Sequence, residues 1–228
     1  MKKVNQKSRN FFSARSTIYG VISVIFSSPE SDKFSMILNH NLRECALDAC
    51  FELEKDEDQE GKMLLSKSFQ KLIEKLDCLE LQTIKDEFVD IFGHTLSKQI
   101  TPYALEHLKN SDVFFRTQKL ADLNGFYKAF GMEVESIERA DHISTQTEFL
   151  SFILLKGMLA DQNHLFDQKE ICEKAVLDFQ KEHFLDWVEI FSENMVNYVD
   201  KGFYPLSGKF LSEFICREKS NLYSLKKS

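Results

Sequence analysis

The stretch ERADHISTQTEFL occupies residues 138–150, and the apolar residues SFILL follow it directly. Within it, polar side chains recur every three or four residues, which is the spacing of neighbours on one face of a helix. They are Glu138, Asp141, Thr145 and Glu148. Phe152 and Leu155 continue the same face, so we predict a helix whose stripe begins acidic and becomes apolar. Such a stripe is typical of one wall of a peptide-binding groove, because a solvated face would stay polar and a core face would be apolar throughout.

Helical periodicity extends over the rest of the chain. One apolar stripe near the N-terminus consists of Ala14, Ile18, Ile22, Ile25 and Phe26. Another consists of Val113, Leu120, Leu123, Tyr127 and Phe130, and Gly131 is expected to end that helix. The 228 residues include only 8 Gly and 3 Pro, too few for the turns of a sheet protein. We therefore predict an all-α, single-domain bundle of roughly eight to eleven helices spanning residues 1–228.

Three segments are predicted to lie outside the packed bundle. Residues 1–10 and 219–228 are basic and are expected to form flexible tails. Residues 54–62, EKDEDQEGK, are expected to form a charged loop that no core would accept. The apolar part of the N-terminal region is too short for a membrane span, and Arg15, Ser16 and Thr17 precede it, so we expect an ordinary first helix.

Charge and cysteine content narrow the class of protein. The net charge is −7 and the isoelectric point about 5.5, which argues against nucleic acid or an anionic membrane surface as the main partner. The five cysteines are odd in number and include no C-x-x-C pair. A disulfide framework, a zinc ribbon and a redox dithiol are therefore not expected. The sequence favours a cytoplasmic protein whose cysteines are reduced.

The motifs of nucleotide-binding and hydrolytic enzymes are absent. No G-x-x-x-x-G-K, G-x-G-x-x-G or G-x-S-x-G occurs, and we predict neither an enzyme nor a cofactor. One metal alternative stays open, because Glu138 and His142 are four residues apart and Asp141 adds a third possible ligand. The competing interpretation is that Asp141 caps a helix while His142 packs beside it.

A family resemblance is carried by several motifs in order along the chain. Glu138-Arg139-Ala140-Asp141-His142, followed by Glu148-Phe149-Leu150, resembles the E-R-P-D-H…E-F-M motif of the TorD/DmsD/NarJ family. Further pieces that resemble family motifs are Tyr19…Phe26-Ser27-Ser28-Pro29, Phe88…Phe92-Gly93, Pro102-Tyr103, Phe126-Tyr127…Gly131 and Phe203-Tyr204-Pro205. There are two departures: Ala140 replaces the usual Pro, and Ala104-Leu105 replaces an acidic residue and Ser, which leaves Glu106 as a substitute.

The resemblance implies a redox enzyme maturation chaperone. Its partner would be the twin-arginine-type leader, and the apo-form, of a molybdoenzyme catalytic subunit. Such a receptor needs carboxylates for two guanidinium groups and an apolar trough for the remainder of the leader. The leader-binding residues expected on this basis are Glu138, Arg139, Asp141, His142, Thr145 and Glu148, with Phe92, Gly93 and Tyr103 as the opposing wall.

Two other functions remain possible from the sequence. One is a helical protein–protein adaptor that binds a mature folded partner and no leader. The other is the metal-dependent enzyme centred on Glu138, Asp141 and His142. We expect a monomer or a homodimer without stable membrane insertion, and the sequence does not identify the client enzyme.

Overall fold

The chain is helical throughout the residues that the structure, a computed structural model, describes. These are residues 2–55, 64–93, 100–108, 112–134, 138–198 and 202–225. Their α-helices are α1 Lys2–Ile25, α2 Asp32–Ser35, α3 His40–Glu54, α4 Leu64–Asp77, α5 Leu81–Phe92, α6 Val113–Ala129, α7 Ile143–Gln162, α8 Phe166–Phe179, α9 Leu185–Val196 and α10 Phe203–Leu225. Within these ranges the β-pairing is limited to an isolated bridge between Tyr103 and His142. The predicted all-α fold is confirmed.

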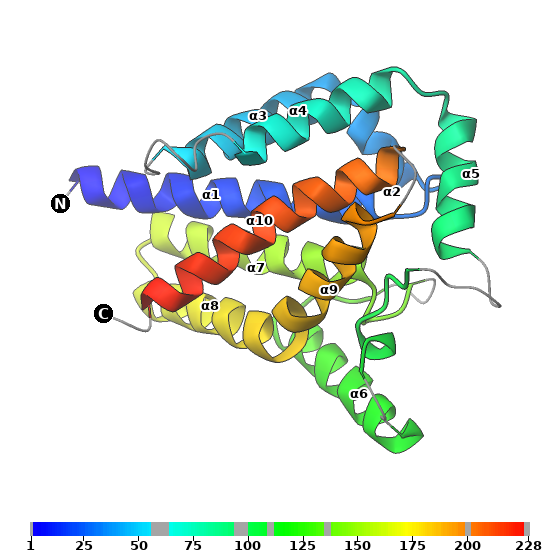
Figure 1. The fold of residues 1–228 in the computed structure, drawn as a ribbon. Helices are drawn as coiled ribbons and strands as arrows, with labels where there is room; N and C mark the ends of the chain where they lie inside the picture. Colours follow the sequence, from blue (N-terminus) through cyan, green and yellow to red (C-terminus); the bar gives the residue numbers. More distant parts are fainter. Residues whose placement is uncertain are drawn as a thin grey trace.

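Helix α1 is the centre of the bundle. It packs most extensively against α7 and also against α3 (Figure 1). Its residues from Val21 to Ile25 are all buried, so the end of α1 is surrounded on every side. Two short segments, α2 and the turn Met36–Leu38, follow it and lead into α3.

Small polar side chains allow α1 and α7 to approach closely. The hydroxyl of Ser23 donates to the carbonyl of Ser144 at 2.6 Å, and the hydroxyl of Ser144 donates back to the carbonyl of Ser23 at 2.7 Å. Ser16 and Ser151 repeat this reciprocal pair, with 2.8 Å for each bond. A buried hydroxyl must find a partner, so these two pairs fix the register of α7 against the central helix. They thereby position the beginning of α7.

Helix α10 closes the bundle against α9, α4 and α5. The carboxylate of Glu87 in α5 accepts hydrogen bonds from the first two amides of α10, Phe203 and Tyr204, at 2.9 Å each. Farther along α10, Glu218 is buried and binds Arg15 through both carboxylate oxygens, at 2.8 and 2.7 Å. A charged pair that is fully bonded in this way holds α1 and α10 together.

Helices α8 and α9 are joined by a π-helical turn, Gln180–Phe184. Gln180 is buried and its amide donates to the hydroxyl of Tyr19 and to Glu218. The wide turn is therefore attached to the same network that joins α1 and α10. Such turns insert an extra residue into a helix and are frequent at functional sites.

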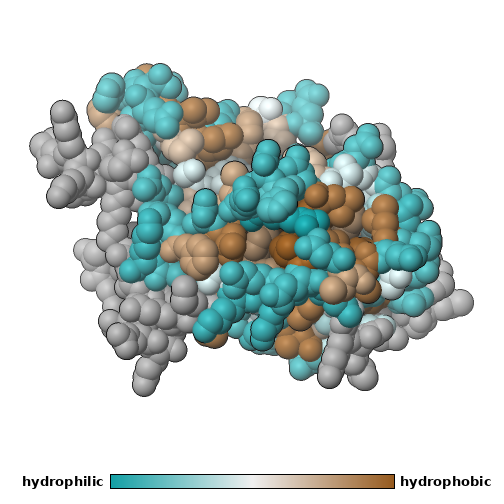
Figure 2. Space-filling model, turned by 90° about the horizontal axis from the view of Figure 1, so that it is seen from above, coloured by the Kyte–Doolittle hydropathy of each residue, from teal (hydrophilic) through white to brown (hydrophobic). Residues whose placement is uncertain are grey.

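Helix α4 has one apolar and one polar face. In α4 the buried residues include Leu65, Phe69, Leu72 and Leu76. The face over α3 and α4 is largely hydrophilic, with hydrophobic strips between the charged side chains (Figure 2). Helix α5 stands at one edge of the bundle, and α6 projects from the body (Figure 1).

The three segments expected to lie outside the packed bundle differ in the structure from that prediction. Helix α1 begins at Lys2 and α10 ends at Leu225, so both expected tails are helical over most of their length. In the predicted loop, residues 56–62 lie outside the described residues. Glu54 contradicts that prediction, because it is buried at the end of α3 and accepts hydrogen bonds from the amides of Leu65 and Ser66. It caps α4, with Arg217 as counter-charge at 3.3 Å.

Candidate functional site

The candidate site is built where the loop before α7 meets the segment before α6. The amide of Ala104 donates to the carbonyl of Asp141, and the amide of Ile143 donates to the carbonyl of Pro102, both at 2.9 Å. Tyr103 and His142 thus form an antiparallel bridge. Two regions that the sequence analysis assigned to opposite walls are therefore neighbours here.

Asp141 is completely buried, and both its oxygens are bonded. Arg139 binds it in bidentate fashion, with Nε to Oδ1 and Nη2 to Oδ2 at 2.9 Å each. The amide of Leu105 also donates to Oδ2 at 3.1 Å. The carboxylate therefore joins the two segments, and it has no free oxygen to offer a second guanidinium.

Arg139 has three partners in addition to its solvent-exposed edge. Its guanidinium carbon lies 4.3 Å from the centre of the Tyr103 ring, which is a cation–π contact. Besides Asp141 it bonds Glu106 at 3.2 Å. Glu106 in turn accepts from the hydroxyl of Thr101 at 2.8 Å. The surface at this point binds a guanidinium group by one aromatic face and two carboxylates.

His142 is the N-cap of α7. Its Nδ1 accepts a hydrogen bond from the amide of Ser144 at 3.2 Å, so this nitrogen carries no proton. Burial, assisted by the charges of Lys33 and Arg139, lowers the pKa of His142 to about 3. Glu138 lies 3.8 Å from the same nitrogen, but a neutral imidazole makes no ion pair with it. In the interpretation that competed with a metal site, Asp141 was to cap the helix and His142 to pack beside it; the structure instead gives the cap to His142.

Glu138 borders this arrangement and is partly accessible, with 35% of its side chain exposed. Burial raises the pKa of Glu138, while Lys33 and a hydrogen bond with Tyr103 act in the opposite direction. The pKa of the Tyr103 hydroxyl is raised too, first by burial and then by Glu138. A carboxylate in these surroundings favours a cation near it, because a cation stabilises its charged form.

Glu148 and Thr145 lie on α7 itself but in different environments. Thr145 is buried, whereas 53% of the Glu148 side chain is exposed. Lys33 of α2 forms an ion pair with Glu148 at 2.6 Å. The predicted single helical stripe was therefore wrong in part, because α7 begins only at Ile143 and Glu138 and Asp141 belong to the preceding loop.

Phe92 and Gly93 are placed differently from the rest of the predicted site. The Phe92 ring packs against Tyr204 at 5.2 Å and against Phe191 at 6.3 Å, which is a core environment. Gly93 ends α5, and a Cβ there would lie 2.6 Å from the carbonyl oxygen of Val89. Glycine is needed at this position because any side chain would collide with the last turn of α5. A contact of either residue with a leader stays a prediction, and residues 94–99 beyond them lie outside the described residues.

The metal alternative does not fit the contacts of its ligands. Asp141 has both oxygens bonded, and the Nδ1 lone pair of His142 accepts from the α7 backbone. In the ranges that the structure describes, no three His, Cys, Asp or Glu side chains are grouped to hold a metal ion. The alternative would require these side chains to give up the bonds that join the two segments.

From the sequence, Lys33 of this site was missed and Glu106 was assigned no definite role. Lys33 is far away in the chain and follows no pattern that would connect it with Glu148. Glu106 was considered only as a substitute for a family residue, and it proves to be a partner of Arg139. Glu106, Glu138 and Asp141 lie around the Tyr103 ring, and Glu148 is connected to them through Lys33, which also acts on Glu138. We name these four carboxylates the acidic cluster.

Comparison of the sequence with known protein families identifies the family of the chain. The sequence model described as "Nitrate reductase delta subunit" matches residues 57–193, more than half of the chain. The chain belongs to the nitrate reductase delta subunit family. This is a family of molybdoenzyme maturation chaperones, and the predicted resemblance is confirmed. No curated protein matches the sequence individually.

The nitrate reductase delta subunit match covers most of the site. It includes the segment 101–106, the loop before α7 and Glu148 of α7, and thus every member of the acidic cluster. Lys33 lies outside the matched residues, as do α1, α2 and α10. Among the described residues of this family member, no helix combines the length and the apolar character needed to cross a membrane.

Proposed function

We propose that this chain is a cytoplasmic chaperone that binds the N-terminal, twin-arginine-type leader of a molybdenum-containing redox enzyme subunit. In this role it assists maturation and cofactor insertion, and it holds the apo-subunit back from export until the cofactor is in place. Family membership supports a role in molybdoenzyme maturation. The observation that carries leader binding is the way in which the acidic cluster already holds the guanidinium of Arg139.

The cluster has more carboxylates than its own arginine uses. Arg139 is held by Asp141 and Glu106 on the face of Tyr103. Two carboxylates remain accessible. Glu138 lies in the loop before α7, and Glu148 lies on α7 itself. We infer that these two carboxylates receive the leader arginines, since guanidinium groups bond carboxylates in bidentate fashion. Asp141 then serves to build the site and does not touch the leader.

Leader binding would displace Lys33 from Glu148. This ion pair is partly exposed on both sides, and pairs of this kind contribute only about 0–1 kcal/mol. A guanidinium that bonds two carboxylate oxygens replaces the single lysine contact at little cost. Lys33 therefore acts as a temporary counter-charge while no leader is bound.

The apolar part of the leader has a candidate surface farther along α7. Phe152, Leu155 and Leu159 follow Glu148 at intervals of three and four residues, so they share its side of the helix. Leu155 and Leu159 are exposed, and Phe152 is half-buried. A helical leader with two arginines followed by an apolar stretch would match this order of charge and apolar area.

The decisive experiment is titration calorimetry with synthetic leaders from the molybdoenzymes of the same genome. The double variant Glu138→Gln/Glu148→Gln should weaken binding of the cognate leader by about tenfold or more, because each lost charge-assisted hydrogen bond contributes about 1.5–3 kcal/mol. Glu213→Gln is the matched control, since Glu213 is a carboxylate paired with Lys209 on α10. A leader with two lysines in place of its arginines should also bind more weakly.

The possible results separate the proposal from its alternatives. Full-strength binding by the double variant would place the leader elsewhere on the molecule. Equal losses in the double variant and the Glu213→Gln control would reduce the effect to net charge. Binding of no leader would refute the leader-binding function itself.

A helical adaptor is the second candidate function, and one observation favours it. Val113 and Phe114, at the beginning of the projecting helix α6, are 81% and 79% exposed (Figure 1). Large apolar side chains with this exposure are typical of contacts with another protein. An adaptor would bind the folded mature subunit and ignore its isolated leader, so a pull-down with each of these two baits distinguishes the functions.

A further inference from the structure

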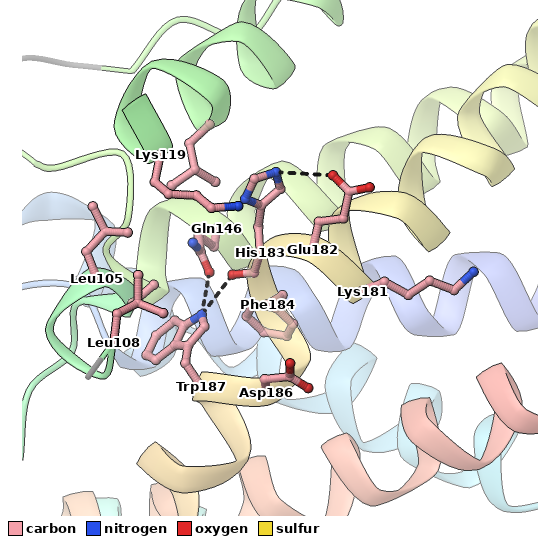
Figure 3. Close-up of a pocket in the computed structure, with 12 residues that line it drawn as sticks. Leu105, Leu108, Lys119, Gln146, Lys181, Glu182, His183, Phe184, Asp186 and Trp187 are labelled. Atoms are coloured by element: carbon pink, nitrogen blue, oxygen red, sulfur yellow. Dashed lines mark hydrogen bonds and ion pairs between the residues drawn. The ribbon is translucent and has the colours of Figure 1, made fainter. Parts of the chain in front are cut away.

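A cavity of about 110 Å³ lies between α6, the beginning of α7, the turn Ala104–Glu106 and the π-turn. It is several times larger than the roughly 10–15 Å³ that one water molecule needs. Its walls are mainly apolar. They include Leu105, Leu108, Phe184 and Trp187 (Figure 3), and also Leu123. It is separated from the acidic cluster by the backbone of Leu105, whose amide faces Asp141.

A buried amide in this cavity has an unused donor. Gln146 of α7 has no solvent exposure, and its Oε1 accepts from the indole Nε1 of Trp187 at 3.0 Å. Because the indole only donates, this bond fixes the orientation of the amide. Within the described parts of the chain, Nε2 of Gln146 has no hydrogen-bond partner. Figure 3 shows this nitrogen directed away from Trp187, toward the side of Leu105 and Lys119.

One positive charge faces the same space. Lys119 reaches from α6 toward the ring of His183, while Lys181 extends away from Gln146 (Figure 3). The negative side chain of Glu182 lies on the other side of His183, 3.9 Å from its Nε2. The side of the cavity near Gln146 therefore combines an amide donor with an ammonium group. The other lining residues are mainly apolar, and the side chains of Glu182, His183 and Asp186 complete the walls.

The fold holds these groups in place independently of any ligand. The π-turn is attached through Gln180 to Tyr19 and Glu218 of the buried network. It presents His183 and Phe184 to the cavity, and the carbonyl of His183 accepts a second bond from Trp187 at 3.0 Å. A donor that is kept buried and unpaired in a rigid wall needs an acceptor from outside.

We propose that this cavity binds a small monocarboxylate with a short apolar chain. One carboxylate oxygen accepts from Nε2 of Gln146, and the ammonium of Lys119 compensates the charge. The apolar chain packs against the leucines and against Phe184 and Trp187. The site is separate from leader binding, with which it shares only the turn Ala104–Glu106.

The test uses the intact chain and isovalerate as the probe. Trp187 is the sole tryptophan of the sequence, so its fluorescence reports directly on the cavity. We expect a saturable fluorescence change with a dissociation constant in the range of about 1 mM. Isovaleramide should bind more weakly, and isoamyl alcohol, which lacks the carbonyl acceptor and the charge, should bind weakest.

Two variants assign the binding to the named groups. Gln146→Met removes the donor at similar volume and should weaken isovalerate binding by about tenfold or more. Lys119→Met, at a half-exposed position that does not threaten the fold, should weaken isovalerate binding and leave isovaleramide binding unchanged. Lys209→Met on α10 is the matched control. The absence of a saturable signal with isovalerate, undiminished binding by the folded variants, or tighter binding of the alcohol than of the acid would each overturn the proposal.

Discussion

Lowering the pH is expected to destabilise the fold through His142. Burial first, and then Lys33 and Arg139, lower the pKa of His142 to about 3, whereas histidine in an unfolded chain has a pKa of about 6.5. Between these values the unfolded state binds a proton and the folded state does not, so the free energy of unfolding rises with pH. The stabilisation is fully present above about pH 6.5 and is lost as the pH falls toward about 3.

The magnitude follows from the width of this pH window. Each pH unit inside it changes the free energy of unfolding by up to about 1.4 kcal/mol. Between pH 7 and pH 5, His142 alone therefore removes about 2 kcal/mol of stability, since the unfolded histidine becomes almost fully protonated over this range. This is a large fraction of the roughly 5–15 kcal/mol that stabilises a typical domain.

The assay is urea unfolding at pH 7, 6 and 5 for the native chain and for His142→Asn. Asparagine is a favourable N-cap that accepts the Ser144 amide without titrating, so it keeps the cap and removes the proton site. Glu138 titrates with the opposite sign, because burial raises its pKa, and His183 titrates in the same direction as His142. Glu138 and His183 are both present in His142→Asn, so their contributions largely cancel when the pH dependence of the variant is subtracted from that of the native chain. Equal pH dependence of the two proteins would refute the neutral cap.

Three further changes test the packing that supports the site. Arg15→Met should lower the free energy of unfolding by about 3–5 kcal/mol, because it leaves Glu218 buried without its charge partner. In urea unfolding, the double variant Arg15→Met/Glu218→Leu should lose much less stability than the sum of the two single changes. Gly208→Ala should cost about 1–3 kcal/mol, measured by thermal unfolding, since a Cβ there would lie 2.3 Å from that of Met195. Glu87→Ala should cost about 1–3 kcal/mol in the same assay, because it leaves two α10 amides without their acceptor, and a change under 0.5 kcal/mol would contradict this role.

The helices could be predicted from the sequence because their signal is local. The spacing of apolar residues in α4 matches the side that faces the core, and Gly131 adopts the positive φ of 79° expected of a helix stop. In α6 the same pattern misled: Leu123 and Tyr127 are buried, but Val113 is exposed. Periodicity shows which side chains share a face, whereas burial depends on whether another element covers that part of the helix.

The partners of the charged residues could not be predicted, because they are distant in the chain. Glu54 is in an acidic run, yet it is buried since α4 and Arg217 fold onto it. Lys33 reaches Glu148 only because the fold brings these two distant residues together. Local sequence records that these residues are charged, and only the tertiary fold decides which of them are paired.

In the proposed mode of leader binding, the Asp-His pair of the family motif builds the site and does not itself contact the leader. Asp141 was expected to receive a leader arginine, but its oxygens are occupied by Arg139 and by the Leu105 amide. His142 was expected in the same role, and it caps the beginning of α7 as a neutral side chain. Replacing either residue would disturb the junction of two segments, and leader binding would then be lost for structural reasons. Loss of binding in such variants cannot assign the contact. Glu148 is paired with Lys33, and glutamine at position 138 can still accept the Tyr103 hydrogen bond, so these two carboxylates can be changed while the bonds of Asp141 and His142 stay in place.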